Sequence, residues 1–142
     1  MRNLFIIIFT IIIISFISCE EKEKGTMNKT GTLQGTIGIY EGNCMPGPES
    51  SLCEHSPIST TVAITYPAEY FNAALLVDSV ITSEDGTFEM SLPEGYYSLF
   101  IRDSAEFICD RWNCQNECNC TLFKIKNDSV TIVNANIDHA TW

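Results

Sequence analysis

Residues 82–102 read TSEDGTFEMSLPEGYYSLFIR, and this stretch decides the fold class. Apolar residues occupy positions 88, 90 and 92, and after a turn they occupy positions 97, 99 and 101. Alternation with a period of two is typical of β-strands that bury one face. Gly86 and Gly95 stand where hairpin turns need a positive φ. The stretch therefore predicts two antiparallel strands with a turn on either side of the first.

The same pattern extends to both ends of the chain. Five further short runs are divided by turn residues, and none of them has a helical period: Leu33–Ile39, Thr60–Tyr66, Ala74–Ile81, Leu122–Lys126 and Val130–Ile137. Seven short strands in a chain of 142 residues predict one all-β domain over residues 32–142. We expect an antiparallel seven-stranded β-sandwich.

The charge balance excludes one class of partner. The chain has 18 acidic and 8 basic residues, which give a formal net charge of −10. Such a chain repels a phosphate backbone instead of releasing its counterions. We therefore expect no nucleic-acid partner.

The N-terminus has the layout of a secretory signal peptide over residues 1–18. Arg2 precedes an apolar run, Leu4–Ile17, which reaches only ~21 Å as a helix and falls short of the ~30 Å hydrocarbon core. A retained transmembrane anchor is the alternative. Residues 16–19, Phe-Ile-Ser-Cys, resemble the lipobox of bacterial lipoproteins, with Phe16 where leucine is usual. The resemblance implies cleavage before Cys19 and acylation of that cysteine with chains such as palmitate, which would attach the protein to a membrane.

Residues 19–31 are polar and read as a flexible acidic tether behind the lipidated cysteine. The cluster Glu20–Lys24 resembles the export signal of some lipoproteins of gram-negative bacteria. It implies an outer-membrane lipoprotein of the cell envelope, on the periplasmic or the surface-exposed face. The alternative is that these charges only keep the linker extended.

The cysteine count agrees with lipidation. Seven cysteines become six once Cys19 is assigned to the lipid, and six can pair completely. We expect Cys44 to pair with Cys53 across a loop rich in proline and glycine, which would stabilise the fold by up to ~2.7 kcal/mol. The pairing within the second cluster, Cys109, Cys114, Cys118 and Cys120, stays open.

The second cluster also permits a metal or redox function. Four thiolates could hold zinc, and Cys118–Cys120 could act in redox chemistry. However, the usual zinc-knuckle spacing is absent, an oxidising compartment favours disulfides, and acidic neighbours such as Asp110 and Glu117 disfavour a reactive thiolate. We predict disulfides, with no metal and no cofactor.

Four segments resemble the carboxypeptidase regulatory-like domain, a transthyretin-like β-sandwich: Gly31–Gly35, Pro57–Ile64, Thr82–Phe88 and Leu92–Leu99. Their most specific elements are the D-G-x-F turn and the P-x-G-Y-Y-x-L strand. The resemblance covers residues 31–142 and departs from the family in two cysteine-bearing insertions, Tyr40–Pro57 and Asp103–Cys120. It implies a non-catalytic module that binds partners or supports a fold.

The residues themselves also predict a protein that is not an enzyme. His55 and His139 are the available near-neutral bases, and there is no G-x-S-x-G nucleophile elbow and no glycine-rich phosphate loop. A hydrolase triad built on Asp138 and His139 would lack that elbow. The Glu84–Asp85 turn could be proposed as a calcium site, but no further ligands follow it.

Three tripeptides resemble an O-glycosylation acceptor of exported bacterial proteins. They place candidate glycosylated serines at Ser79, Ser104 and Ser129, each after an aspartate. The alternative is that these Asp-Ser pairs only form turns. If the serines are modified, their hydroxyl groups must face solvent.

These observations favour a lipid-anchored binding or structural module whose stapled loops meet a protein or glycan partner. Phe107, Arg111, Trp112 and Asn113 are residue types suited to such an interface. Alternatively, Trp112 packs over the disulfides as a local core. Metal or redox handling by the second cysteine cluster, and inhibition of a protease by a rigid loop, are the competing hypotheses.

Overall fold

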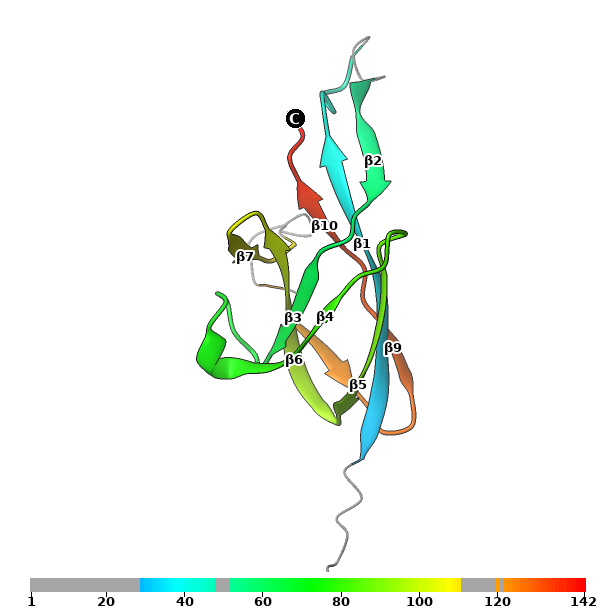
Figure 1. Cartoon of the computed structure of the whole chain (residues 1–142), viewed down its shortest axis with the longest axis vertical. Helices are drawn as coiled ribbons and strands as arrows, with labels where there is room; N and C mark the ends of the chain where they lie inside the picture. The colour runs from blue at the N-terminus through cyan, green and yellow to red at the C-terminus, as the bar shows by residue number, and fades with distance from the viewer. Residues whose placement is uncertain (1–28, 48–51, 111–119, 121) are drawn as a thin grey trace, which may run out of the picture.

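The computed structural model describes residues 29–47, 52–110, 120 and 122–142. These residues form ten strands: β1 (Thr30–Glu41), β2 (Glu54–Pro57), β3 (Thr61–Thr65), β4 (Leu76–Ile81), β5 (Thr87–Pro93), β6 (Gly95–Asp103), β7 (Glu106–Ile108), β8 (Leu122–Ile125), β9 (Val130–Ile132) and β10 (Ala135–Asp138). A 3-10 helix, η2 (Ala73–Leu75), precedes β4. Two five-stranded sheets form a β-sandwich, so the predicted all-β fold class is confirmed (Figure 1).

The first sheet is built around β1. The N-terminal part of β1 pairs with β5 on one side and β9 on the other, and its C-terminal part pairs with β2 and β10. β1 therefore runs from one end of the molecule to the other, and the C-terminus lies beside its far end (Figure 1). The second sheet has the order β4-β3-β6-β7, with β8 also paired to β6.

Alternating residues of both sheets meet in the main core. Phe88, Met90 and Leu92 of β5 are buried, as are Tyr97, Leu99 and Ile101 of β6. Buried aliphatic residues from β1, β3, β8 and β10 complete this core: Leu33, Ile37, Ile39, Val62, Ile64, Ile125, Ala135 and Ile137. The period-two pattern of residues 82–102 thus marks the buried face correctly.

The structure differs from seven antiparallel strands in two respects. β2 and β7 lie within the two segments interpreted as insertions, and the last predicted run is divided into β9 and β10. Both of these last strands pair with β1 in parallel, although the other pairings are antiparallel. The division has a local cause, because Asn134 Oδ1 accepts hydrogen bonds from the Thr36 backbone N–H and hydroxyl, both at 3.0 Å. The Asn134 side chain thereby takes the place of a backbone hydrogen-bond acceptor between β1 and the last two strands.

One glycine turn is as predicted and the other is not. Gly86 has a φ of 75°, and a Cβ there would lie 2.3 Å from the Ile37 carbonyl oxygen, so only glycine fits. Gly95 does not adopt a positive φ, so that expectation was wrong. A Cβ at Gly95 would approach the Tyr97 hydroxyl to 3.2 Å, so crowding accounts for the glycine.

The first strand begins two residues earlier than the predicted start of the domain. Thr30 pairs with Pro93, and Gly31 pairs with Leu92. The predicted signal peptide, Cys19 and most of the tether lie outside the described residues. Within the described part of the chain, no helix is long and apolar enough to cross a membrane.

A candidate binding groove on the outer face of the second sheet

The outer face of the second sheet carries its own small core. Ser98 and Phe100 point away from the main core on β6, yet each is only 1% exposed. Phe100 packs with Ala63 and with two cysteines, Cys109 and Cys120. This group, together with Ala68, Phe71 and Phe107, is here called the outer cluster. The outward face of β6 is therefore buried at its middle, at Ser98 and Phe100, although Tyr96 and Arg102 on the same face are exposed.

Residues 66–75 form a loop that covers the outer face. The Tyr66 backbone N–H donates to the Leu75 carbonyl oxygen at 3.0 Å, which closes the loop on itself. Asn72 caps the short helix η2 by accepting a hydrogen bond from the Ala74 N–H at 2.9 Å. The Ala68 N–H donates to the Ser98 hydroxyl at 3.1 Å, which satisfies this buried polar group and fixes the loop over β6.

Aromatic rings join this loop to β7. The Phe71 ring stacks on Phe107 with a centroid distance of 4.2 Å, and meets Phe100 edge to face at 5.8 Å. The Arg102 guanidinium lies 5.9 Å from the centroid of the Phe107 ring. These are favourable aromatic and cation–π geometries. Side-chain contacts among these aromatic rings thus connect the loop 66–75 to β6 and β7.

A disulfide between Cys109 and Cys120 completes the outer cluster. Its sulfurs are nearly inaccessible, since Cys109 is 8% exposed and Cys120 is 3% exposed. The Cys120 Sγ atom lies 2.8 Å from the Glu69 carbonyl oxygen, which places the bridge against the covering loop. Because these two cysteines are joined, the four-thiolate zinc site of the alternative hypothesis is not formed. Cys114 and Cys118, with Arg111, Trp112 and Asn113, lie outside the described residues.

A groove of about 850 Å³ opens beside the outer cluster. Its aromatic lining comes from four parts of the chain: Tyr40, Tyr70, Phe71, Phe100 and Phe107. Its carboxylates come from the covering loop, the β7 region and β10: Glu69, Glu106, Asp110 and Asp138. None of the described residues that line it is a lysine, an arginine or a histidine. The described lining is therefore aromatic and acidic.

The four carboxylates have two different roles. Asp110 accepts a hydrogen bond from the Asn136 backbone N–H at 2.9 Å. Asp138 accepts from the Trp142 indole N–H at 2.9 Å and from the Ala140 N–H at 3.0 Å. Asp110 therefore holds β10 in place, and Asp138 orders the residues that follow that strand. Glu69 and Glu106 are exposed, and their carboxylates have no hydrogen-bond or ion-pair partner within the described part of the chain.

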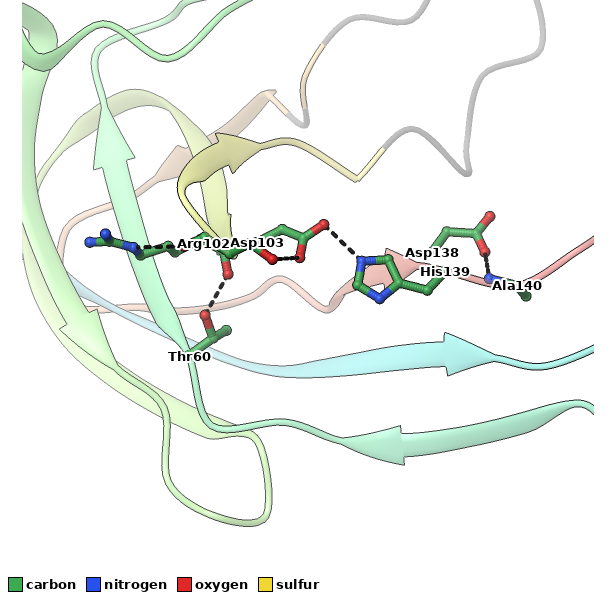
Figure 2. Close-up of polar contacts among 7 residues, drawn as sticks. Thr60, Arg102, Asp103, Asp138, His139 and Ala140 are labelled. Carbon is green, nitrogen blue, oxygen red and sulfur yellow. Dashed lines mark hydrogen bonds and ion pairs between the residues drawn. The ribbon is translucent and has the colours of Figure 1, made fainter.

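A contact between a histidine and an aspartate joins the end of β6 to the residue that follows β10. Figure 2 shows His139, directly after β10, pointing to Asp103 at the end of β6, and Nε2 lies 2.9 Å from Oδ2. Ser104 adopts a φ of 53° in the turn between β6 and β7, and its hydroxyl is directed to Asp103 at 3.5 Å. A nucleophilic triad requires the serine to contact the histidine. Here both contact the same carboxylate, so the arrangement positions the β6–β7 turn.

A second disulfide lies outside the outer cluster, at the tip of the hairpin formed by β1 and β2. Cys44 is bonded to Cys53 as expected, with 4.6 Å between their Cα atoms. His55 lies on β2, where its ring packs 4.4 Å from that of Tyr40 and its Nε2 contacts Asn136 Oδ1 at 3.0 Å. His55 thus joins the hairpin to β10.

The three candidate glycosylation serines differ in exposure. Ser79 and Ser104 are exposed, whereas Ser129 is half-buried and its hydroxyl donates to the Lys126 carbonyl oxygen at 2.8 Å. Ser79 lies within β4, so this Asp-Ser pair does not form a turn. Two of the three candidate serines are therefore exposed to solvent.

The acidic turn before β5 is held by its own hydrogen bonds. Asp85 accepts from the Ser83 hydroxyl and from the Thr87 hydroxyl and N–H. These bonds, that of Ser83 first, hold the pKa of the Asp85 carboxyl below its usual value. The same bonds engage Asp85 Oδ1 in the turn itself.

Sequence reasoning missed most of the groove. Glu69, Tyr70 and Phe71 were treated as a connection between strands, and Glu106 as part of an insertion. Two signals point to them. The first is the unbroken apolar run Leu99–Ile101, which is typical of a strand buried on both faces. The second is the density of aromatic residues in the loop 66–71, which is high for an exposed connection.

Comparison with known proteins adds little to this description. No protein-family model and no curated protein matches the chain. The chain is similar to a DUF3823 family protein from Parabacteroides merdae, with 18% sequence identity and a TM-score of 0.39. The match covers 75% of this chain but only 45% of the chain of that protein. The groove is therefore interpreted from its own residues.

Proposed function

We propose that this chain is an exported, lipid-anchored β-sandwich that acts as a non-catalytic binding module at the cell envelope, with the acidic aromatic groove as its binding surface. The groove is the observation that carries the proposal. Its volume of about 850 Å³ lies in the range of small-molecule and peptide sites. It is enclosed by a covering loop, a disulfide and the C-terminal strand, which hold its walls in place.

The course of β1 fits an anchored module. The proposed tether would join β1 at Thr30, and Tyr40 near the other end of the same strand lines the groove. Ten residue steps of extended chain span roughly 34 Å. A lipid on Cys19 would therefore attach at the opposite end of β1 from Tyr40, and Figure 1 shows that end away from β7 and β10. The binding surface would then be held clear of the membrane.

The family assignment is part of the proposal. The D-G-x-F turn of the resemblance places Gly86 at a positive φ and directs Phe88 into the main core. In the following P-x-G-Y-Y-x-L segment, the Tyr97 hydroxyl donates to the Pro93 carbonyl oxygen at 2.9 Å. The two elements that resemble the carboxypeptidase regulatory-like domain thus have defined structural roles here. The outer cluster is added to that framework.

Anchoring is tested by the intact mass of the protein extracted from native membranes. We expect a chain that starts at an acylated Cys19, together with masses that report any glycan on Ser79 or Ser104. The Cys19→Ala variant is the control, and it should lose the lipid and leave the membrane fraction. An unmodified chain in the soluble fraction of wild-type cells would contradict the proposal.

Binding is tested by photo-crosslinking in the producing cells. A benzophenone amino acid replaces Tyr70, which lines the groove and is 73% exposed. The matched control replaces Tyr96, which is 54% exposed on β6 and does not line the groove. We expect an adduct of defined mass at position 70 that is absent at position 96. If neither position forms an adduct, or if both form it equally, the proposal that the groove is the binding surface is contradicted.

A further inference from the structure

We propose that the groove binds cationic side chains, the arginine or lysine residues of a basic peptide segment of its partner. This inference rests on the proposed function, because it names the chemical class of ligand for the same groove. Its basis is the combination of carboxylates and aromatic rings in the lining, without a basic residue among the described residues that contribute to it.

Glu69 and Glu106 supply the negative charge. They belong to two different walls, the covering loop and β7, and both are exposed. Neither carboxylate is engaged within the described part of the chain, whereas Asp110 and Asp138 have structural hydrogen bonds. An incoming ammonium or guanidinium group would therefore find two carboxylates ready to accept charge-assisted hydrogen bonds.

The balance of hydrogen-bonding groups favours a cation over a neutral sugar. Carboxylates only accept hydrogen bonds, so the lining is rich in acceptors. The described lining side chains that can donate are the Asn136 amide and the Tyr40 and Tyr70 hydroxyls, against four carboxylates that only accept. A sugar hydroxyl needs donors as well as acceptors, whereas a guanidinium group brings five N–H donors and needs only acceptors.

The aromatic residues of the cluster already accommodate a guanidinium group. Arg102 lies over the Phe107 ring at 5.9 Å, within the range of a cation–π contact. Tyr70 offers a largely exposed ring at the groove itself. A cation in the groove would therefore find both a π surface and carboxylates, the pairing that favours arginine.

The size of the groove indicates a segment and not a single ion. A space of about 850 Å³ accepts more than one side chain, so we infer a short stretch of peptide. The net charge of −10 would attract such a segment over longer distances. This general attraction is also the main competing explanation for any binding, and the test must separate the two.

The test uses the full mature protein in a neutral detergent and a fluorescent peptide with alternating glycine and arginine. The reference peptide replaces each arginine by citrulline, which keeps the shape and removes the charge. We expect the arginine peptide to bind and the citrulline peptide not to bind. We also expect binding to weaken as salt is added, because salt screens exposed charges.

The decisive variants have equal charge. Glu69→Gln with Glu106→Gln should weaken binding of the arginine peptide by about tenfold or more, since both charge-assisted contacts are lost. Glu84→Gln with Glu94→Gln removes the same charge from exposed positions outside the groove, and it should change binding by less than about twofold. Thermal unfolding of each variant checks that the fold is retained.

Three outcomes would overturn the inference. Equal losses in both double variants would show that only net charge attracts the peptide. Equal binding of the citrulline peptide, or binding of a neutral oligosaccharide in its place, would show that the groove does not select cations. Absence of peptide binding with a clear crosslink at position 70 would refute the inference and leave the proposed function standing, whereas absence of both would refute the two together.

Discussion

The two described disulfides close loops of nearly equal length in very different surroundings. Cys44 and Cys53 are 9 residues apart, and Cys109 and Cys120 are 11 residues apart. Loop-closure entropy would therefore give each bridge about 2.7 kcal/mol. One bridge closes the tip of the β1–β2 hairpin, and the other is packed inside the outer cluster. Any difference in their contributions must come from packing.

The hairpin bridge belongs to neither hydrophobic cluster, although Cys44 itself is only 9% exposed. Met45 and Leu52 beside it are 47% and 60% exposed. The hairpin also has other links to the sandwich, because the Cys44 N–H donates to the Thr141 carbonyl oxygen at 2.8 Å. The outer bridge, by contrast, shares its cluster with Phe100 and Phe107. The hairpin bridge is therefore a covalent crosslink at a loop tip, whereas the outer bridge is part of a hydrophobic cluster.

The largest effect should follow from removing the outer bridge. We expect Cys109→Ala with Cys120→Ala to lower the free energy of unfolding by about 4 kcal/mol, because lost packing adds to lost closure entropy. Urea denaturation of the mature protein measures this loss. The same variant should also weaken binding in the groove, since Cys109 lines it. A loss no larger than that of the hairpin variant would break the comparison.

Removing the hairpin bridge should have a smaller effect. We expect Cys44→Ala with Cys53→Ala to cost about 2 kcal/mol, less than the closure estimate, because the opened tip also gains freedom in the folded state. Hydrogen exchange should speed up at Glu41 and Glu54 and stay slow at Leu99. Faster exchange throughout the core would show that the tip is not a separate unit.

The hairpin was more predictable from the sequence than the outer cluster. Cys44 and Cys53 flank a turn-rich segment and pair locally, so spacing alone identifies them. Phe100 falls outside the buried positions 97, 99 and 101 that the period of two predicts. That pattern marks one buried face, and it carries no information that residues 66–75 return to cover the opposite face of β6. Glu69, Tyr70 and Glu106 escaped notice for the same reason, since the groove exists only once that loop is folded over β6.

The parallel pairing of β9 and β10 was also beyond local patterns. The run Val130–Ile137 was interpreted as one strand, but its apolar residues change from even to odd positions at Ile132 and Val133, and Asn134, through its bonds to Thr36, divides it. Antiparallel pairing is the usual choice for short connections, and turn residues give no sign of a departure from it. Pairing with β1 is decided by which side of that strand is open after β5 and β2 are placed. The sequence pattern thus predicts which residues form a strand, whereas the partner of each strand depends on the tertiary fold.

A final, smaller effect would sharpen the boundary between the main core and the outer cluster. Tyr97 is 3% exposed in the main core, its hydroxyl donates to the Pro93 carbonyl oxygen, and its ring lies 6.1 Å from that of Tyr66 at the start of the covering loop. Burial, with a smaller contribution from Tyr66, raises the pKa of Tyr97 above its usual value of 10.0. The folded state therefore favours the protonated phenol. Its contribution to stability is complete below pH 10.0 and is lost as pH rises from there through the folded pKa.

Tyr97→Phe should cost about 1 kcal/mol near neutral pH, because the hydrogen bond to Pro93 is lost. It should also make the free energy of unfolding decrease less steeply with pH in the alkaline range, and urea midpoints measured across that range report both effects. The control variant Tyr96→Phe, at an exposed position, should change neither the stability near neutral pH nor its alkaline decrease. The sharper result comes from titrating the phenol absorbance of the variant that lacks the outer bridge. If burial in the main core is the chief cause, the pKa of Tyr97 stays raised there. A return to the ordinary tyrosine value would mean that the outer cluster and the main core unfold together, and that the two bridges stabilise one unit.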